Sequence, residues 1–322
     1  MVVIALAASA VAFAVAFFGP WFPEQASVEA GRIAVVFWIT TGICIAIFGL
    51  VTSMLLYSVW KFRARPDDDS DGLPIHGHTG LEIWWTAIPT VLVTVIAISS
   101  AIVLSQNEDA TGAMTVNVTG EQFAWSFEYP ELDGLVSTDL RLPLDQPVKL
   151  VLTAKDVIHS FWVPEFSQKQ DAVPGMTTEL VITPNKIGEY PVICTELCGL
   201  GHATMRSEAK VLSRADFDAW VSDRQGAAAE GGAASGEALF TDNGCGSCHS
   251  LDETKLVGPG LGTLTAAAER AGKPVEEFTR ESIVQPDAYI EPGFPNAMPN
   301  SYGSLSDEQL DALVQYLLEG AE

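Results

Sequence analysis

Cationic side chains are scarce in this sequence. Only 17 of its 322 residues are lysine or arginine, against 41 aspartates and glutamates, so the net charge is −24 at pH 7. A surface this acidic repels phosphate backbones, which argues against nucleic acid as a partner and favours a basic protein. Cysteine, histidine and methionine are also rare, at five, five and six residues. A chain of this length can form two or three domains without disulfides, so these few residues are candidates for chemistry.

Charge is absent from two long stretches, residues 33–60 and 83–107. As a helix, each stretch is long enough to cross a hydrocarbon core of about 30 Å. A pair of buried helices in a large soluble protein is the alternative, but such helices seldom run beyond about twenty residues without a charge. The two stretches therefore predict a transmembrane helical hairpin.

The charges beside these stretches predict their orientation. The connection after the first stretch opens with KFRAR at residues 61–65, and Lys and Arg next to a span are retained on the cytoplasmic side. Everything after Asn107 is then expected outside the cytoplasm. Residues 1–18 are apolar and Ala-rich but lack a positive leader region, so a cleaved signal, an additional span and an interfacial helix all stay open for them.

The rest of the chain divides by composition. Residues 111–212 contain short β-type segments separated by Gly, Pro, Asp and Asn clusters, which predicts a β-sandwich or small barrel. Residues 222–237 are rich in Gly and Ala without a bulky apolar side chain, as in a flexible linker. Beyond them, helical periodicity and a capping box from Ser306 to Gln309 predict a small helical domain. The expected divisions are 1–31 (N-terminal apolar segment), 32–110 (hairpin), 111–221 (β domain), 222–237 (linker) and 238–322 (helical domain).

The first chemical cluster is the segment CTELCGLGHATM, residues 194–205. Its two thiols, imidazole and thioether are soft or borderline ligands that suit copper, and a distant β segment adds a second imidazole. A disulfide would account only for the two cysteines. Zinc would use the cysteines and histidines but not the methionine, so the set favours copper. The candidate residues are His159, Cys194, Glu196, Cys198, His202 and Met205.

These residues resemble the copper A site of cytochrome c oxidase subunit II, which has a Cys-x-Glu-x-Cys-Gly-x-x-His-x-x-Met loop and an upstream His. In that family two thiolates bridge two copper ions, a role that the resemblance carries to Cys194 and Cys198. His159 and His202 would then bind one copper each. The resemblance implies a cupredoxin-like fold for the β domain.

Three further positions follow from the same resemblance. Met205 and the backbone carbonyl of Glu196 would be weak axial ligands, and the Glu196 side chain would bind magnesium at the interface with subunit I. The segment LEIWWTAIP resembles the family's second span, where a glutamate lies at the cytoplasmic mouth of a proton path; Glu82 takes that place. The alternative interpretation, which the residue alone would favour, is that Glu82 is a carboxylate stabilised at a helix N-terminus in the headgroup layer.

Two positions depart from the family pattern. Where the family has Gln-Trp-aromatic-Trp, whose first Trp accepts electrons from soluble cytochrome c, this chain has Gln122-Phe123-Ala124-Trp125. Phe123 and Trp125 are therefore candidates for the electron-accepting surface, and the alternative is that both rings belong to the sandwich core. Met176 stands where many members have an arginine, so one expected interface cation is missing.

The second cluster is CGSCH, residues 245–249, the attachment signature of c-type haem. Cys245 and Cys248 would form the thioethers and His249 would be an axial iron ligand. A thioredoxin-like pair would need a βαβ context, whereas these surroundings are helical. Met298, the only methionine after the linker, is the candidate sixth ligand, and a His/Met pair suits electron transfer. The segment 257–264 and the last helix resemble a class I cytochrome c.

Together the resemblances imply subunit II of a bacterial haem–copper cytochrome c oxidase with a fused cytochrome c. Electrons would pass from haem c to copper A and on to subunit I, where oxygen reduction drives proton pumping. The implied partners are subunits I and III, with a basic soluble cytochrome c or a membrane cytochrome complex as donor. The implied location is the bacterial plasma membrane, crossed more than once, with both centres on the periplasmic or extracellular side. The alternatives are a membrane-tethered module of another terminal reductase and a structural subunit of a quinol oxidase.

Overall fold

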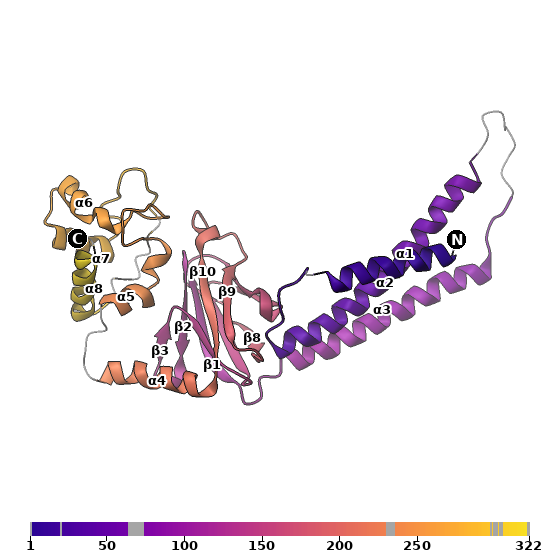
Figure 1. The fold of residues 1–322 in the computed structure, drawn as a ribbon, viewed down its shortest axis with the longest axis horizontal. Helices are drawn as coiled ribbons and strands as arrows, with labels where there is room; N and C mark the ends of the chain where they lie inside the picture. The colour runs from indigo at the N-terminus through magenta and orange to yellow at the C-terminus, as the bar shows by residue number, and fades with distance from the viewer. Residues whose placement is uncertain are drawn as a thin grey trace. The chain divides into compact units, whose positions relative to one another are not determined.

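The computed structural model describes residues 2–19, 21–63, 74–229, 236–296, 298, 302 and 305–320. The chain forms two compact units. The first comprises Met1–Glu24 and Ala30–Glu108, and the second comprises Gln25–Glu29 and Asp109–Glu322. Figure 1 labels the helices and strands of both units.

The first unit consists of three apolar helices, α1 (Val2–Phe18), α2 (Val28–Lys61) and α3 (Thr79–Asn107). In both α2 and α3 the most apolar 18 residues have a mean hydropathy of 2.4, and none of them is buried. Helices of a soluble core would bury such surface, so a membrane-facing role is favoured. Helix α1 packs on α2 through Phe13 and Phe17, whose rings lie 6.2 and 5.1 Å from Trp38. Most of the connection whose charges predict the orientation, residues 64–73, lies outside the described residues.

Two five-stranded sheets form the β domain, with orders β3-β2-β1-β5-β8 and β4-β10-β9-β6-β7. Alternate residues face the space between the sheets, as the pattern of buried and half-buried positions along β1 and β5 shows. Phe127, Leu150 and Phe161 are fully buried there. The strands are β1 (Met114–Glu121), β2 (Ala124–Tyr129), β3 (Leu135–Ser137), β4 (Leu140–Pro143), β5 (Val148–Ala154), β6 (His159–Val163), β7 (Gln168–Ala172), β8 (Thr178–Ile182), β9 (Gly188–Cys194) and β10 (Arg206–Leu212).

The segment Gln25–Glu29, which includes the first two residues of α2, belongs to the sandwich unit. The backbone N–H of Ala26 donates to the carbonyl of Glu165 at 2.9 Å, and Ser27 forms a β-bridge with Pro184. The buried Glu29 carboxylate accepts a hydrogen bond from the N–H of Thr183 at 2.9 Å. These contacts tie the chain at the start of α2 to the edge of the sandwich.

Helix α4 (Arg214–Ala229) follows the last strand and corrects part of the expected linker. Residues 222–229 continue this helix instead of forming flexible coil, because their alanines are strong helix formers. Trp220 of α4 packs on Tyr129 with ring centroids 5.3 Å apart, and the Arg141 guanidinium lies 5.1 Å from the Trp220 ring. The remainder of the expected linker, 230–235, lies outside the described residues.

The C-terminal domain is helical, with α5 (Gly236–Asp242), α6 (Leu264–Ala271), α7 (Val275–Val284) and α8 (Asp307–Glu319). The capping box at the start of α8 is present: Gln309 N donates to Ser306 Oγ at 3.3 Å, and Ser306 N donates to Gln309 Oε1 at 3.0 Å. Apolar residues of these helices form a separate core that includes Leu239, Phe278 and Leu313.

Candidate copper and haem sites

The sheet β4-β10-β9-β6-β7 positions the first candidate site at one end of the sandwich. Cys194 is the last residue of β9 and His159 is the first of β6. These strands pair with each other, with Phe161 opposite Cys194, so the histidine from a distant segment comes to lie beside the loop. His159 Nδ1 is 3.9 Å from the Cys194 sulfur.

The loop between β9 and β10 folds back so that its other donors meet at the same point. The Cys198 sulfur lies 3.9 Å from that of Cys194, 3.6 Å from His202 Nδ1 and 3.8 Å from the Met205 sulfur. The Cys194 thiol also lies 3.3 Å from the backbone carbonyl of Glu196. The donor atoms of all the residues that the sequence singles out are therefore brought together.

The donor set fits a buried metal centre. One atom from each of His159, Cys194 and Cys198 falls within 4.8 Å of the others, and all three side chains are buried. The two sulfurs are much farther apart than the roughly 2.05 Å of a disulfide, and both cysteines are free. Two thiolates, two imidazoles and a thioether are the ligand types that copper prefers.

Asp156 orients the histidine, a contact that the sequence reasoning missed. Its Oδ1 lies 2.9 Å from His159 Nε2, which leaves Nδ1 directed at Cys194. Burial opposes ionisation of Asp156, but hydrogen bonds from His159 and from backbone N–H groups outweigh it and lower the pKa of the carboxyl. A carboxylate three residues before the histidine, in the motif DVIH, is the sequence signal that could have indicated this pair.

The two thiols of the site have different acidities. Burial opposes ionisation of Cys194, but hydrogen bonding to His159 and to the Ser160 and Glu196 backbone lowers the pKa of this thiol below its ordinary value. Burial and the neighbouring Cys194 charge raise the pKa of Cys198. Cys194 therefore ionises before Cys198, and metal binding releases the proton that the second thiol still holds.

Phe123 and Trp125 are both buried, at 5% and 2% exposure. The Trp125 ring packs edge-on against His159 at 6.0 Å, so it belongs to the core directly behind a ligand position. Phe123 lies against the copper loop: a Cβ added to Gly201 would be 2.5 Å from the Phe123 ring, and one added to Gly199 would be 3.2 Å from it. The two glycines make room for this ring.

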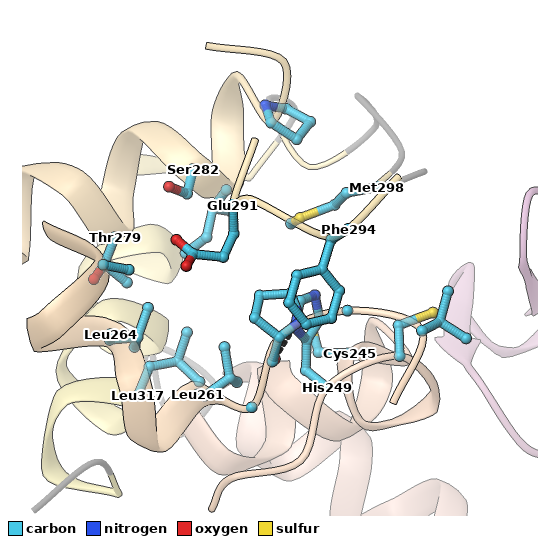
Figure 2. A pocket seen from close by; sticks show the side chains of 18 of the residues that line it. Cys245, His249, Leu261, Leu264, Thr279, Ser282, Glu291, Phe294, Met298 and Leu317 are labelled. Atoms are coloured by element: carbon cyan, nitrogen blue, oxygen red, sulfur yellow. Dashed lines mark hydrogen bonds between the residues drawn. The ribbon is translucent and has the colours of Figure 1, made fainter. Parts of the chain in front are cut away.

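The second candidate site is an apolar cavity in the helical domain, shown in Figure 2. Cys245 and Cys248 bracket a single 3₁₀ turn, and the N–H of His249 donates to the carbonyl of Cys245 at 2.9 Å. His249 Nδ1 donates to the carbonyl of Pro259 at 2.9 Å, which leaves Nε2 free for a metal. Met298 also lines the cavity. The four haem-binding candidates therefore share one cavity.

The cavity residues fit a covalently held haem. Leucines 261, 264, 313 and 317 contribute to the lining. Gly258 lies so close to His249 that a Cβ there would collide with the imidazole ring, so the segment 257–264 needs glycine at this point. Burial raises the pKa of Cys245 to about 12 and lowers the pKa of His249. A neutral imidazole is the form that binds iron.

Three protein families match the chain. "Cytochrome C oxidase subunit II, transmembrane domain" matches residues 15–103, "Cytochrome C oxidase subunit II, periplasmic domain" matches 134–211, and "Cytochrome c" matches 233–321. Curated relatives carry the same description. Cytochrome c oxidase subunit 2 of Synechocystis sp. is 35% identical over 247 residues, covering 62% of this chain and 74% of the relative. The Alkalihalophilus pseudofirmus protein of that name is 30% identical over 298 residues, covering 87% and 86%.

A solved structure also matches part of the chain. The periplasmic domain of subunit II of the Bradyrhizobium japonicum cytochrome oxidase is 30% identical, with 35% of this chain and 93% of that chain covered and a TM-score of 0.34.

The fold and sites define a membrane-anchored electron-transfer protein with a cupredoxin-like sandwich and a helical cytochrome c domain. The chain belongs to the cytochrome c oxidase subunit II family. It is thus a subunit of an oxidoreductase complex whose partner is subunit I, and its two outer domains imply copper A and haem c. The predicted fold class is confirmed.

Proposed function

We propose that this chain accepts electrons at a covalent haem c, passes them to a copper A centre and delivers them to subunit I for oxygen reduction coupled to proton pumping. When bound, the two centres supply one-electron oxidation and reduction. Cys245 and Cys248 would hold the haem covalently, and His249 and Met298 would bind its iron. The copper ions would be held by His159, Cys194, the Glu196 carbonyl, Cys198, His202 and Met205.

The position of Phe123 is the observation that carries this proposal. Its ring packs against Gly199 and Gly201 of the copper loop. Phe123 and Ala124 also line the cavity of the helical domain, which belongs to the same compact unit. An aromatic ring in contact with both sites supports direct transfer between them. A donor tethered in this way does not need the surface tryptophan that a free cytochrome would use.

The protein around the copper ligands keeps their geometry fixed while charge changes. His159 is set by the paired strands β6 and β9 and by Asp156. The side-chain amide of Gln122 donates to the carbonyl of Cys198 and holds the loop. Rigid ligands make transfer fast because little reorganisation accompanies a change of redox state.

The tip of the copper loop is the proposed contact with subunit I. Leu197 and Leu200 are 78% and 84% exposed, which is a larger exposed apolar area than a surface without a partner needs. Glu196, which lies between the two cysteines, is also exposed. We assign magnesium binding at this interface to the Glu196 carboxylate.

A family match to a periplasmic domain supports the outer side of the bacterial plasma membrane for both centres, with α2 and α3 as spans.

Glu82 is the proposed proton-path entrance. It lies in the first turn of α3, where its Oε1 accepts a hydrogen bond from the N–H of His78 at 2.9 Å. A carboxylate in the first turn of a helix is expected to be stabilised in this way, and the hydrogen bond fixes the Glu82 carboxylate at one end of the span.

Subunit III is a further proposed partner.

The donor is proposed to be basic. Residues 226–322 contain sixteen acidic and only four basic side chains, so the helical domain attracts a basic cytochrome, soluble or membrane-bound. Raising the ionic strength should slow this step.

Loss of the haem thiols tests the proposed function. In the purified complex, Cys245→Ala combined with Cys248→Ala should abolish turnover with a cytochrome donor, while the copper centre still accepts electrons from a small-molecule reductant. Cys44→Ala, which removes an exposed thiol of α2, is the matched control and should keep full turnover. Undiminished turnover without the haem thiols would refute the proposal.

A further inference from the structure

Met298 lies in the long connection between α7 and α8, and its backbone has neither helix nor strand conformation. Regular structure therefore does not fix its side chain, although that side chain lines the same cavity as His249. A thioether is a weak ligand, so it stays on a metal only where the surrounding chain holds the sulfur in place. The contacts of this connection therefore decide how firmly Met298 can bind iron.

Tyr302 anchors the connection four residues after Met298. Its hydroxyl donates to the backbone carbonyl of Asn243 at 3.2 Å. The Tyr302 ring is partly buried against the core of the helical domain and lines the cavity with Met298. Burial raises the pKa of the Tyr302 hydroxyl above its ordinary value, so the hydroxyl keeps its proton and can donate at neutral pH.

The acceptor of this hydrogen bond is itself fixed. Asn243 directly follows α5, and its backbone N–H and side-chain amide both donate to the carbonyl of Leu239, at 3.0 and 2.8 Å. Asn243 also lies two residues before Cys245, the first thiol of the attachment motif. One hydrogen bond therefore joins the segment that carries Met298 to the turn that carries the haem thiols.

Another contact holds the connection on the other side of Met298, and it is the weaker of the two. Glu291, seven residues before Met298, accepts a hydrogen bond at Oε1 from Arg270 Nη2 at 2.7 Å. The Arg270 side chain is 46% exposed, and ion pairs that reach water contribute little to stability. Removing the Tyr302 hydroxyl leaves the partly buried Asn243 carbonyl without this donor, which is the larger loss.

We propose that Tyr302 is a positioning residue that keeps Met298 on the haem iron by anchoring its segment to the Asn243 carbonyl. This inference rests on the proposed function, because it requires haem c in the cavity with Met298 as an axial ligand. Tyr302 acts through the chain, by limiting how far the thioether can move away. Without the anchor, the sixth position of the iron opens more often to external ligands.

The test is a carbon monoxide titration of the reduced full-length chain, purified alone in detergent. Carbon monoxide competes with the thioether for the sixth position, so a weaker hold on Met298 raises the apparent affinity for carbon monoxide by the same factor. Loss of one hydrogen bond of this kind corresponds to about a three- to tenfold change. Tyr302→Phe, which removes only the hydroxyl, should therefore bind carbon monoxide about three- to tenfold more tightly than the unchanged chain.

A matched substitution separates this anchor from packing in the cavity. Tyr289 lines the same cavity, and its hydroxyl donates to Oε2 of Glu291, only two residues further on, at 3.2 Å. Tyr289→Phe therefore removes a hydroxyl without releasing distant segments from each other, and the affinity for carbon monoxide should not change. In Met298→Ala, which has no thioether to hold, adding Tyr302→Phe should produce no further change.

Failure of this inference is distinguishable from failure of the proposed function. If the unchanged chain gives no covalent haem stain, or if Met298→Ala does not bind carbon monoxide more tightly, the haem assignments of the proposed function fail. If Met298→Ala responds but Tyr302→Phe behaves like Tyr289→Phe, only the role of Tyr302 is overturned. An equal effect of Tyr302→Phe with and without Met298 would overturn it too. So would loss of covalent haem in Tyr302→Phe, because the anchor would then act on haem attachment.

Discussion

The Asp156 carboxylate lies 2.9 Å from Nε2 of His159, on the side of the ring opposite the cysteine cluster. This contact selects which ring nitrogen faces the metal site. Loss of a carboxylate that hydrogen-bonds a metal-binding histidine typically lowers metal affinity about 10- to 100-fold. Asp156→Ala should therefore weaken copper binding by that factor, measured by competition with a copper chelator. Asp171→Asn, an exposed position on β7, should bind copper normally, and equal affinity in Asp156→Ala would contradict the orienting role.

Copper uptake by the metal-free chain should depend on pH because of the unequal thiols. The pKa of Cys198 is raised and that of Cys194 is lowered, so near neutral pH the Cys198 proton must leave when copper binds. Affinity should then rise about tenfold per pH unit for each proton released. Chelator competition at several pH values, with proton release followed by a pH indicator, measures this slope. A flat profile would show that both thiols are already ionised.

The packing of Phe123 on the copper loop makes Gly201 sensitive to a single added methyl group. Gly201→Ala places a Cβ 2.5 Å from the aromatic ring, and overpacking of this kind costs about 1–3 kcal/mol. Denaturant unfolding of the full chain should show the loss. Gly226→Ala, where nothing lies within 4 Å of the added carbon, should be neutral or stabilising because alanine favours helix α4. Equal stability of the two variants would mean that the ring is free to move away.

Met298 should close the haem iron to external ligands. Replacing its sulfur in Met298→Ala opens one axial position, so the reduced variant should bind carbon monoxide, and its potential should fall because a thioether ligand raises it. Optical titration with carbon monoxide measures the first effect. Leu256→Ala, at an exposed position, should stay closed to carbon monoxide. Failure of Met298→Ala to bind carbon monoxide would point to another axial ligand.

The local motifs of both sites were readable from the sequence, whereas their supporting contacts were not. Ligands within one loop, such as Cys194 and Cys198, are brought together by short-range spacing alone. The contact between Asp156 and His159 could have been predicted, because the two residues are only three positions apart. The contacts of Phe123 with Gly201 and of Arg270 with Glu291 could not, because they depend on how distant segments pack. The linker prediction erred at 222–229 because an Ala-rich composition suits both a flexible tether and a helix.

Direct transfer between the two centres of this chain is the central claim, and photoreduction of the haem in the purified complex tests it most directly. Haem oxidation and copper reduction should proceed at one shared first-order rate that is unchanged when the protein is diluted tenfold. A rate that falls in proportion to dilution, or haem oxidation without copper reduction, would contradict the account.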